Sequence, residues 1–79
     1  MMKNIANKVY DMLKNYYNAE KNIEVYYVFL NKIRVKFHYL DINVEFVYKY
    51  KTKETLLDNV QNIIMCIDEI VLLIYKKRG

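Results

Sequence analysis

The chain has 79 residues, a formal net charge of +4, and a composition that is 54% hydrophobic and 15% aromatic, with one Gly, one Cys and no Pro. Its length allows a single domain, residues 1–79, and excludes an architecture with separate catalytic and binding domains. Its apolar content excludes intrinsic disorder and linker-rich or collagen-like chains. So short a chain buries a small share of its surface, and we expect its stability to depend on very apolar elements or on a second copy.

The first predicted element is an amphipathic helix over residues 3–18. Its apolar side chains recur at spacings of three and four residues, and polar side chains occupy the other side. The apolar positions are Ile5, Ala6, Val9, Met12, Leu13 and Tyr16. This stripe predicts a helix that covers a neighbouring layer with one face only.

Three runs of alternating apolar and polar residues follow, over 23–29, 33–39 and 42–50. A period of two is typical of half-buried strands, in which one face is buried and the other meets solvent. Because the runs are joined by very short connections, we expect a three-stranded antiparallel meander.

The turns of this meander follow from the rule that paired residues share a face of the sheet. Pairing Phe29 with Ile33 leaves a three-residue loop, makes Asn31 the candidate for a positive φ and places Phe29 on the face that the helices cover. Pairing Tyr39 with Ile42 leaves a two-residue turn without a central Gly or Asn. We therefore expect a distorted or longer hairpin at this second turn.

The last predicted element is a long helix that begins with Thr52 as its N-cap, has Glu54 in its first turn and ends near Lys77. Such a helix is about 36 Å long, whereas a seven-residue strand covers about 23 Å. We expect its C-terminal part, residues 70–75, to overhang the sheet, because this part is apolar around most of its circumference.

The order of elements is α-β-β-β-α, which predicts an α+β fold of two layers. One layer is the three-stranded antiparallel meander, and the other consists of both helices packed on one face of it. The opposite face of the sheet is then open.

Catalytic chemistry is poorly supplied in this sequence. With one His, one Cys and no Ser, the only nucleophile and base pair is Cys66 with His38, and these are predicted to lie on opposite sides of the sheet. The same two residues are too few for a zinc site, and the single Gly excludes a glycine-rich phosphate loop. We expect neither catalytic activity nor a metal or cofactor.

The open face of the sheet is the first candidate binding surface. A basic row on the central strand, with aromatic and apolar neighbours and lysines at one end, is the composition of a platform for single-stranded nucleic acid. The candidate residues are Tyr26, Val28, Arg34, Lys36, His38, Val47, Lys49, Lys51 and Lys53. Two other interpretations remain open: an ordinary solvated face, or a charge-rimmed apolar patch that binds a protein.

The long helix carries the second candidate surface. One apolar stripe with coiled-coil-like spacing suffices to cover the sheet, and a second apolar set remains for another partner. This set, which we expect at a homodimer interface, consists of Met65, Cys66, Leu72, Leu73 and Tyr75. The surplus of apolar side chains on one helix therefore predicts self-association.

These features predict a small non-enzymatic homodimer that binds a protein of a host, of the kind that phages and viruses encode as regulators or inhibitors of host systems. The alternative is a nucleic-acid-binding protein that uses the open sheet face and the start of the second helix. The N-terminus resembles no secretory signal, and the longest apolar run, residues 70–75, is too short to span a membrane. We therefore expect a soluble protein of the cytoplasm, that of the host if the chain is viral, without a membrane partner.

Overall fold

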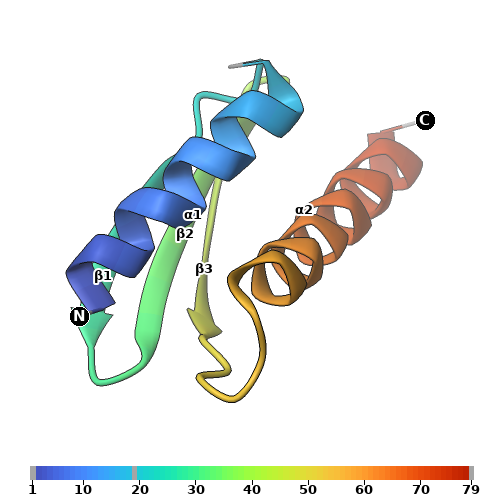
Figure 1. Cartoon of the computed structure of the whole chain (residues 1–79). Helices are drawn as coiled ribbons and strands as arrows, with labels where there is room; N and C mark the ends of the chain where they lie inside the picture. Colours follow the sequence, from blue (N-terminus) through green and yellow to red (C-terminus); the bar gives the residue numbers. More distant parts are fainter. Residues whose placement is uncertain (1, 19, 79) are drawn as a thin grey trace.

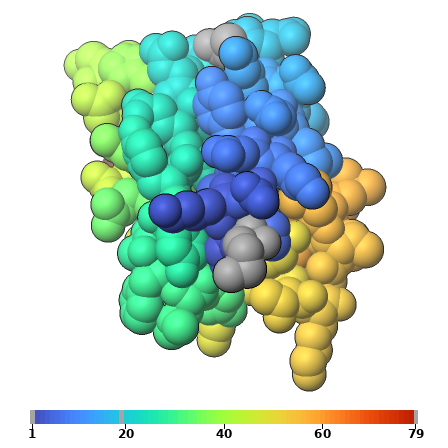
Figure 2. Space-filling model, turned by 60° about the vertical axis from the view of Figure 1, so that its left-hand side comes forward, coloured from blue at the N-terminus to red at the C-terminus, as the bar shows by residue number. Residues whose placement is uncertain are grey.

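The computed structural model describes residues 2–18 and 20–78 and confirms the predicted α+β fold (Figure 1). The elements in chain order are α1 (Met2–Tyr17), β1 (Glu24–Phe29), β2 (Lys32–Tyr39), β3 (Ile42–Lys49) and α2 (Leu56–Arg78). The strands form one antiparallel sheet in the order β1-β2-β3. In the space-filling view, α1 lies along β1 with the start of α2 beside it (Figure 2).

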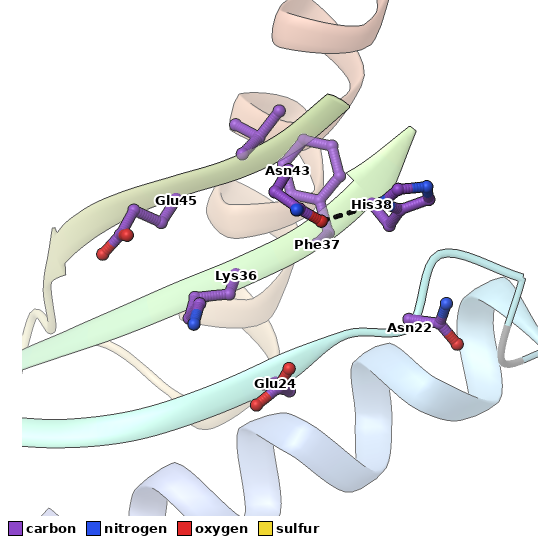
Figure 3. A pocket seen from close by; sticks show the side chains of 8 residues that line it. Asn22, Glu24, Lys36, Phe37, His38, Asn43 and Glu45 are labelled. Atoms are coloured by element: carbon purple, nitrogen blue, oxygen red, sulfur yellow. Dashed lines mark hydrogen bonds between the residues drawn. The ribbon is translucent and has the colours of Figure 1, made fainter. Parts of the chain in front are cut away.

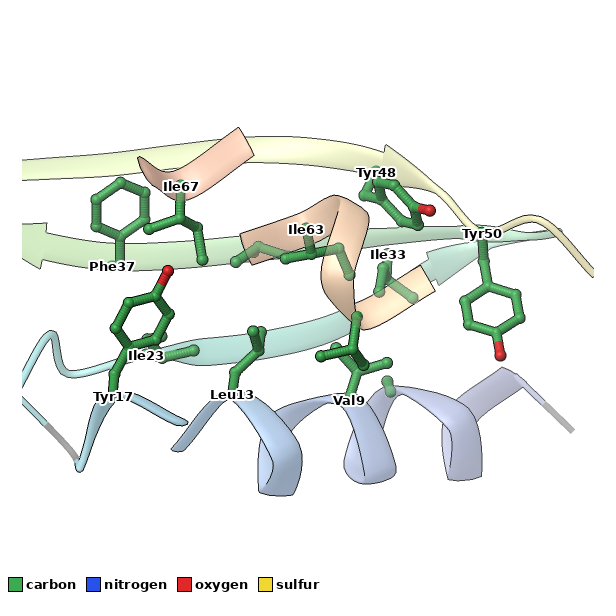
Figure 4. Packing of buried hydrophobic residues seen from close by; sticks show 13 residues of the cluster. Val9, Leu13, Tyr17, Ile23, Ile33, Phe37, Tyr48, Tyr50, Ile63 and Ile67 are labelled. Atoms are coloured by element: carbon green, nitrogen blue, oxygen red, sulfur yellow. The ribbon is translucent and has the colours of Figure 1, made fainter. Parts of the chain in front are cut away.

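The core lies between the sheet and the two helices. On β2, the alternate residues Ile33, Val35 and Phe37 are all buried, which is the pattern of a central strand covered on one face. From α1, Leu13 packs into the same cluster, and Ile63 enters it from α2 (Figure 4). Both helices therefore bury their apolar stripes against the same face of the sheet.

The start of α2 differs from the prediction. The helix begins at Leu56, and the hydroxyl of Thr55 accepts a hydrogen bond of 3.1 Å from the backbone N–H of Asp58, so the N-cap is Thr55 and not Thr52. Both threonines fit the sequence rule for an N-cap, which does not distinguish them. The loop between β3 and α2 is longer than expected as a result, and Glu54 lies in this loop.

The turn between β1 and β2 also differs from the prediction. Tyr27 pairs with Ile33 and Phe29 with Lys32, so a β-bulge lies between Tyr27 and Phe29 and the turn has two residues. Because paired residues share a face, the extra residue moves Phe29 from the helix-covered face to the open face. The positive φ, 53°, is adopted by Leu30 and not by Asn31, the residue next to it.

The turn between β2 and β3 has the predicted pairing of Tyr39 with Ile42. It is a two-residue turn and not a longer one, because Leu40 itself adopts a φ of 56°. Next to it, the guanidinium of Arg78 forms an ion pair with Asp41, 2.5 Å apart. The C-terminal end of α2, which was predicted to overhang the sheet, therefore lies beside the β2–β3 turn.

Candidate functional site

The open face of the sheet carries the side chains that alternate with the core. Cross-strand pairing sets them in rows, with Glu24 opposite Lys36 and Lys36 opposite Glu45. The face is composed of Glu24, Tyr26 and Phe29 on β1; Lys32, Arg34, Lys36 and His38 on β2; and Asn43, Glu45, Val47 and Lys49 on β3. Its two ends differ in charge, and we describe them separately.

The end near the β2–β3 turn, which we call the paired end, consists of Glu24, Lys36, His38, Asn43 and Glu45. These side chains line a shallow depression of about 670 Å³, and a ring nitrogen of His38 lies 2.8 Å from the Asn43 side-chain oxygen (Figure 3). Lys36 lies opposite a carboxylate on each neighbouring strand, although its ammonium forms no ion pair with a described residue and lies 5.9 Å from the centre of the Tyr26 ring.

Two further interactions extend this balance towards the middle of the face. The Nε atom of Arg34 lies 3.2 Å from a carboxylate oxygen of Glu45. The hydroxyl of Tyr26 donates a hydrogen bond to Glu24, and this bond raises the pKa of Tyr26 above its ordinary value. The predicted row of Arg34, Lys36 and His38 therefore exists. Arg34 is ion-paired with Glu45, and Lys36 has a carboxylate opposite it on each neighbouring strand.

The opposite end, which we call the lysine end, consists of Phe29, Lys32 and Lys49 with Lys51 and Lys53 of the adjoining loop. Lys32 and Lys49 are directly opposite each other on β2 and β3. The ammonium of Lys32 lies 5.4 Å from the centre of the Phe29 ring, within the range of a cation–π contact. Positive charge at this end is therefore gathered around an aromatic side chain.

The loop between β3 and α2 extends the lysine end. With Lys49 and Asn31, residues 50–54 line a hollow of about 510 Å³. Two hydrogen bonds join this loop to the β1–β2 turn, because the backbone N–H of Tyr50 donates to the Asn31 carbonyl and the Asn31 side chain donates to the Tyr50 carbonyl. Within the hollow, Lys51 forms an exposed ion pair of 3.8 Å with Glu54.

A fully buried asparagine of α2, Asn59, holds this loop in place. Its amide nitrogen donates to the carbonyls of Lys51 and Thr55, at 3.0 and 2.9 Å. Its amide oxygen accepts from the Tyr48 hydroxyl and from the Lys51 backbone N–H, both at 2.8 Å. A single side chain thus satisfies all four of its hydrogen bonds while joining β3, the loop and the start of α2.

The structure places the predicted face residues in three groups. Six of them share the open face: Tyr26, Arg34, Lys36, His38, Val47 and Lys49. Val28 lies in the bulge, where it has no cross-strand partner, and it is partly exposed. Lys51 and Lys53 lie beyond the end of β3, in the loop and not on the sheet.

The sequence analysis missed three residues that shape this surface: Phe29, Lys32 and Asn59. Strict alternation assigned Phe29 to the core and Lys32 to a loop, and no local signal marks the bulge that changes both. Asn59 could have been found, because it lies within the apolar stripe of α2 where a polar residue needs a buried partner.

The outer surface of α2 is the second candidate site. Five of its apolar side chains are at least half exposed: Leu57, Met65, Leu72, Leu73 and Tyr75. Because successive residues are about 100° apart, Met65 and Leu72 lie opposite the buried stripe. Of the other residues predicted at the dimer interface, Leu73 and the half-buried Cys66 lie on one flank of the helix. Tyr75 lies on the other flank, towards α1. The predicted interface residues therefore spread around much of the helix circumference and do not form one narrow stripe.

The described residues offer neither a metal-ligand cluster nor a helix that could span a membrane. Over residues 2–18 and 20–78, no three His, Cys, Asp or Glu side chains gather in a way that could hold a metal ion. Of the described helices, neither α1 nor α2 combines the length and apolar character that a membrane span requires. Comparison of the chain with protein families, with curated proteins and with solved structures finds no match.

Proposed function

We propose that the protein is a homodimeric binding protein without catalytic activity of its own, in which α2 joins two copies. The paired end of the open sheet face, with its shallow depression, then remains for a partner macromolecule. The partner that we favour is another protein, one of the host if a phage or virus encodes the chain. This is the mode of action of small regulators and inhibitors, which work by covering a surface.

The observation that carries the dimer is the exposure of apolar side chains on α2. Met65 is 61% exposed and Leu72 is 50% exposed, and both point away from the core of their own chain. The matching helix α1 differs, because only Tyr16 among its large apolar side chains is exposed. Large apolar side chains exposed on the outer side of a helix, with charged residues around them, are typical of an interface with a second partner.

A second copy of the chain fits this surface. Met65 and Leu72 are two helical turns apart, and a twofold axis between them would pack Met65 of one copy against Leu72 of the other. In this antiparallel pair, Asp58 near one end of α2 approaches Lys76 near the other end, so opposite charges meet. Asp68 and Glu69 flank the axis and are exposed in the single chain, and the Tyr17 hydroxyl donates a hydrogen bond to Asp68.

The experiment is size-exclusion chromatography with light scattering on Leu72→Glu. We expect the unmodified protein to have twice the 9.7 kDa mass of the chain and the variant to have the mass of one chain, with the same helical circular dichroism. The control is Val47→Glu on the open face, where Val47 is 52% exposed against 50% for Leu72. A monomeric unmodified protein, or a Leu72→Glu variant that stays dimeric, contradicts the proposal.

A further inference from the structure

We infer that the lysine end of the open face, together with the neighbouring Tyr26, binds single-stranded nucleic acid. Bases stack on Phe29 and Tyr26, and Lys32, Lys49 and Lys53 hold the phosphates. This site lies on the opposite side of the sheet from α2. It therefore does not depend on the proposed dimer.

The aromatic part of the site is created by the β-bulge. Phe29 is 53% exposed on the open face, although the burial of a Phe side chain stabilises a fold by about 1.5–3 kcal/mol. Tyr26 is 45% exposed. It pairs with the β2 residue two positions from the partner of Phe29, so the backbone positions of the two aromatic residues are about 7 Å apart along the sheet. Neighbouring bases of an extended strand can stack on two such rings.

The cationic part of the site is uncompensated. Lys32 and Lys49 face each other across β2 and β3, a like-charge pair that destabilises a sheet. Among the described residues, no carboxylate forms an ion pair with Lys32, Lys49 or Lys53. An unfavourable pair at the exposed end of a sheet becomes favourable when a phosphate lies between its members.

The loop supplies the third cation in a fixed position. Asn59 and the two bonds between Asn31 and Tyr50 hold the loop against the β1–β2 turn, so the hollow beside Lys49 and Lys53 is formed before any ligand arrives. A preformed cationic hollow loses little conformational entropy when an anion binds. It continues the line of positive charge past the end of the sheet.

The chemistry of the site favours a single strand over a duplex and backbone contacts over base recognition. Stacking on Phe29 and Tyr26 requires unpaired bases, which a duplex does not offer. The cations at this end are all lysines, which bind phosphates as point charges and lack the planar fork with which Arg recognises guanine. We therefore expect binding with little sequence preference.

The test is fluorescence anisotropy with a labelled oligothymidylate of about 12 nucleotides at about 50 mM salt. Lys32→Glu with Lys49→Glu replaces one like-charge pair by another, so it reverses the surface charge while the repulsion between the strands is retained. We expect this double variant to bind at least about tenfold more weakly and Phe29→Ala at least about fivefold more weakly. The control Lys8→Glu with Lys14→Glu makes the same charge change on α1 and is expected to stay within about twofold.

Several outcomes would overturn the inference. They are the absence of binding at low salt, an equal loss in the α1 control, and equally effective competition by a duplex of the same length. Leu72→Glu is expected to bind the oligonucleotide with unchanged affinity per chain. The dimer and the nucleic-acid site can therefore fail separately.

Discussion

The two ends of the open sheet face lie on the same three strands but differ in charge. One end carries both carboxylates and cations, and the other carries lysines. At the paired end, Lys36 lies between Glu24 and Glu45, and at the lysine end, Lys32 lies between Phe29 and Lys49. The strand periodicity is the same at both ends, so the difference arises from the register. Whether a lysine on β2 has a carboxylate or another lysine as its cross-strand partner therefore sets the local charge of the face.

The turns at the two ends make the same point for the backbone. Leu30 and Leu40 both adopt a left-handed φ, 53° and 56°, in two-residue turns of the type Leu followed by Asn or Asp. A left-handed leucine costs about 1–2 kcal/mol, so each turn is held by its surroundings. Only the β1–β2 hairpin carries a bulge, and this one extra residue moves Phe29 to the open face.

The largest effect on this comparison is expected from Asn59→Ala, which removes the side chain that holds the lysine end in place. It leaves the backbone groups of Lys51 and the hydroxyl of Tyr48 without their partner, and we expect a loss of about 3 kcal/mol in the free energy of unfolding. Urea denaturation followed by circular dichroism measures this loss.

The control for this variant is Asn62→Ala, one turn along the same helix. Within the described part of the chain, the Asn62 side chain makes a single long hydrogen bond, of 3.4 Å to the Tyr48 hydroxyl, so we expect a loss below about 0.5 kcal/mol. Similar losses in the free energy of unfolding of the two variants would mean that the hydrogen bonds of Asn59 do not hold the loop in place.

A smaller effect is expected at the other end of the molecule from Tyr17→Phe. The Tyr17 hydroxyl donates a hydrogen bond of 2.8 Å to Asp68 and so joins the C-terminus of α1 to α2. We expect the variant to lose about 1 kcal/mol in the free energy of unfolding at neutral pH. The control is Tyr16→Phe. The neighbouring Tyr16 is exposed, so we expect removal of its hydroxyl to leave the free energy of unfolding unchanged.

The same pair of variants has a signature in alkaline solution. Burial, with the hydrogen bond to Asp68, raises the pKa of Tyr17 above its ordinary value of 10.0. Because the folded state keeps this proton longer, the contribution of Tyr17 to stability is complete below pH 10.0 and is lost as the pH rises above it. Between about pH 10 and 11, the free energy of unfolding should fall less steeply in Tyr17→Phe than in Tyr16→Phe, and equal slopes would contradict this assignment.

The smallest effect is expected when the carboxylates of the paired end are neutralised, which makes this end cationic like the lysine end. Glu24→Gln with Glu45→Gln removes the carboxylates that balance Lys36 and Arg34. If the lysine end binds single-stranded nucleic acid, we expect affinity for the oligothymidylate to rise about threefold to fivefold and to depend more steeply on salt. An equal rise in the remote control Asp11→Asn with Glu20→Gln would show that net charge and not position is responsible.

Much of this fold could be predicted from the sequence because the elements are strongly periodic. The helical spacing of α1 and α2 and the alternation of the three strands are properties of contiguous residues, and they place Val9, Ile33 and Ile63 in the core without knowledge of their partners. Pairing of Tyr39 with Ile42 followed from the same alternation.

The candidate sites could be predicted only in part. Alternation identified Arg34 and Lys36 on the open face, but it could not show that Glu45 lies opposite Lys36 and forms an ion pair with Arg34, because that depends on cross-strand register. It assigned Phe29 to the core, because a bulge is a property of two paired strands and leaves no trace in either one alone. Two plausible caps, Thr52 and Thr55, could be separated only by the path of the loop that Asn59 holds.

The sequence by itself thus determined the number, type and order of the elements and the buried stripe of each helix, because local spacing and burial decide these. Only the tertiary structure decided which cations are neutralised, which aromatic side chain reaches the open face and how the loop before α2 is held. The reason is physical: charge compensation, bulges and buried hydrogen bonds join residues that are distant in the chain, and their geometry exists only once the strands have paired and the helices have packed.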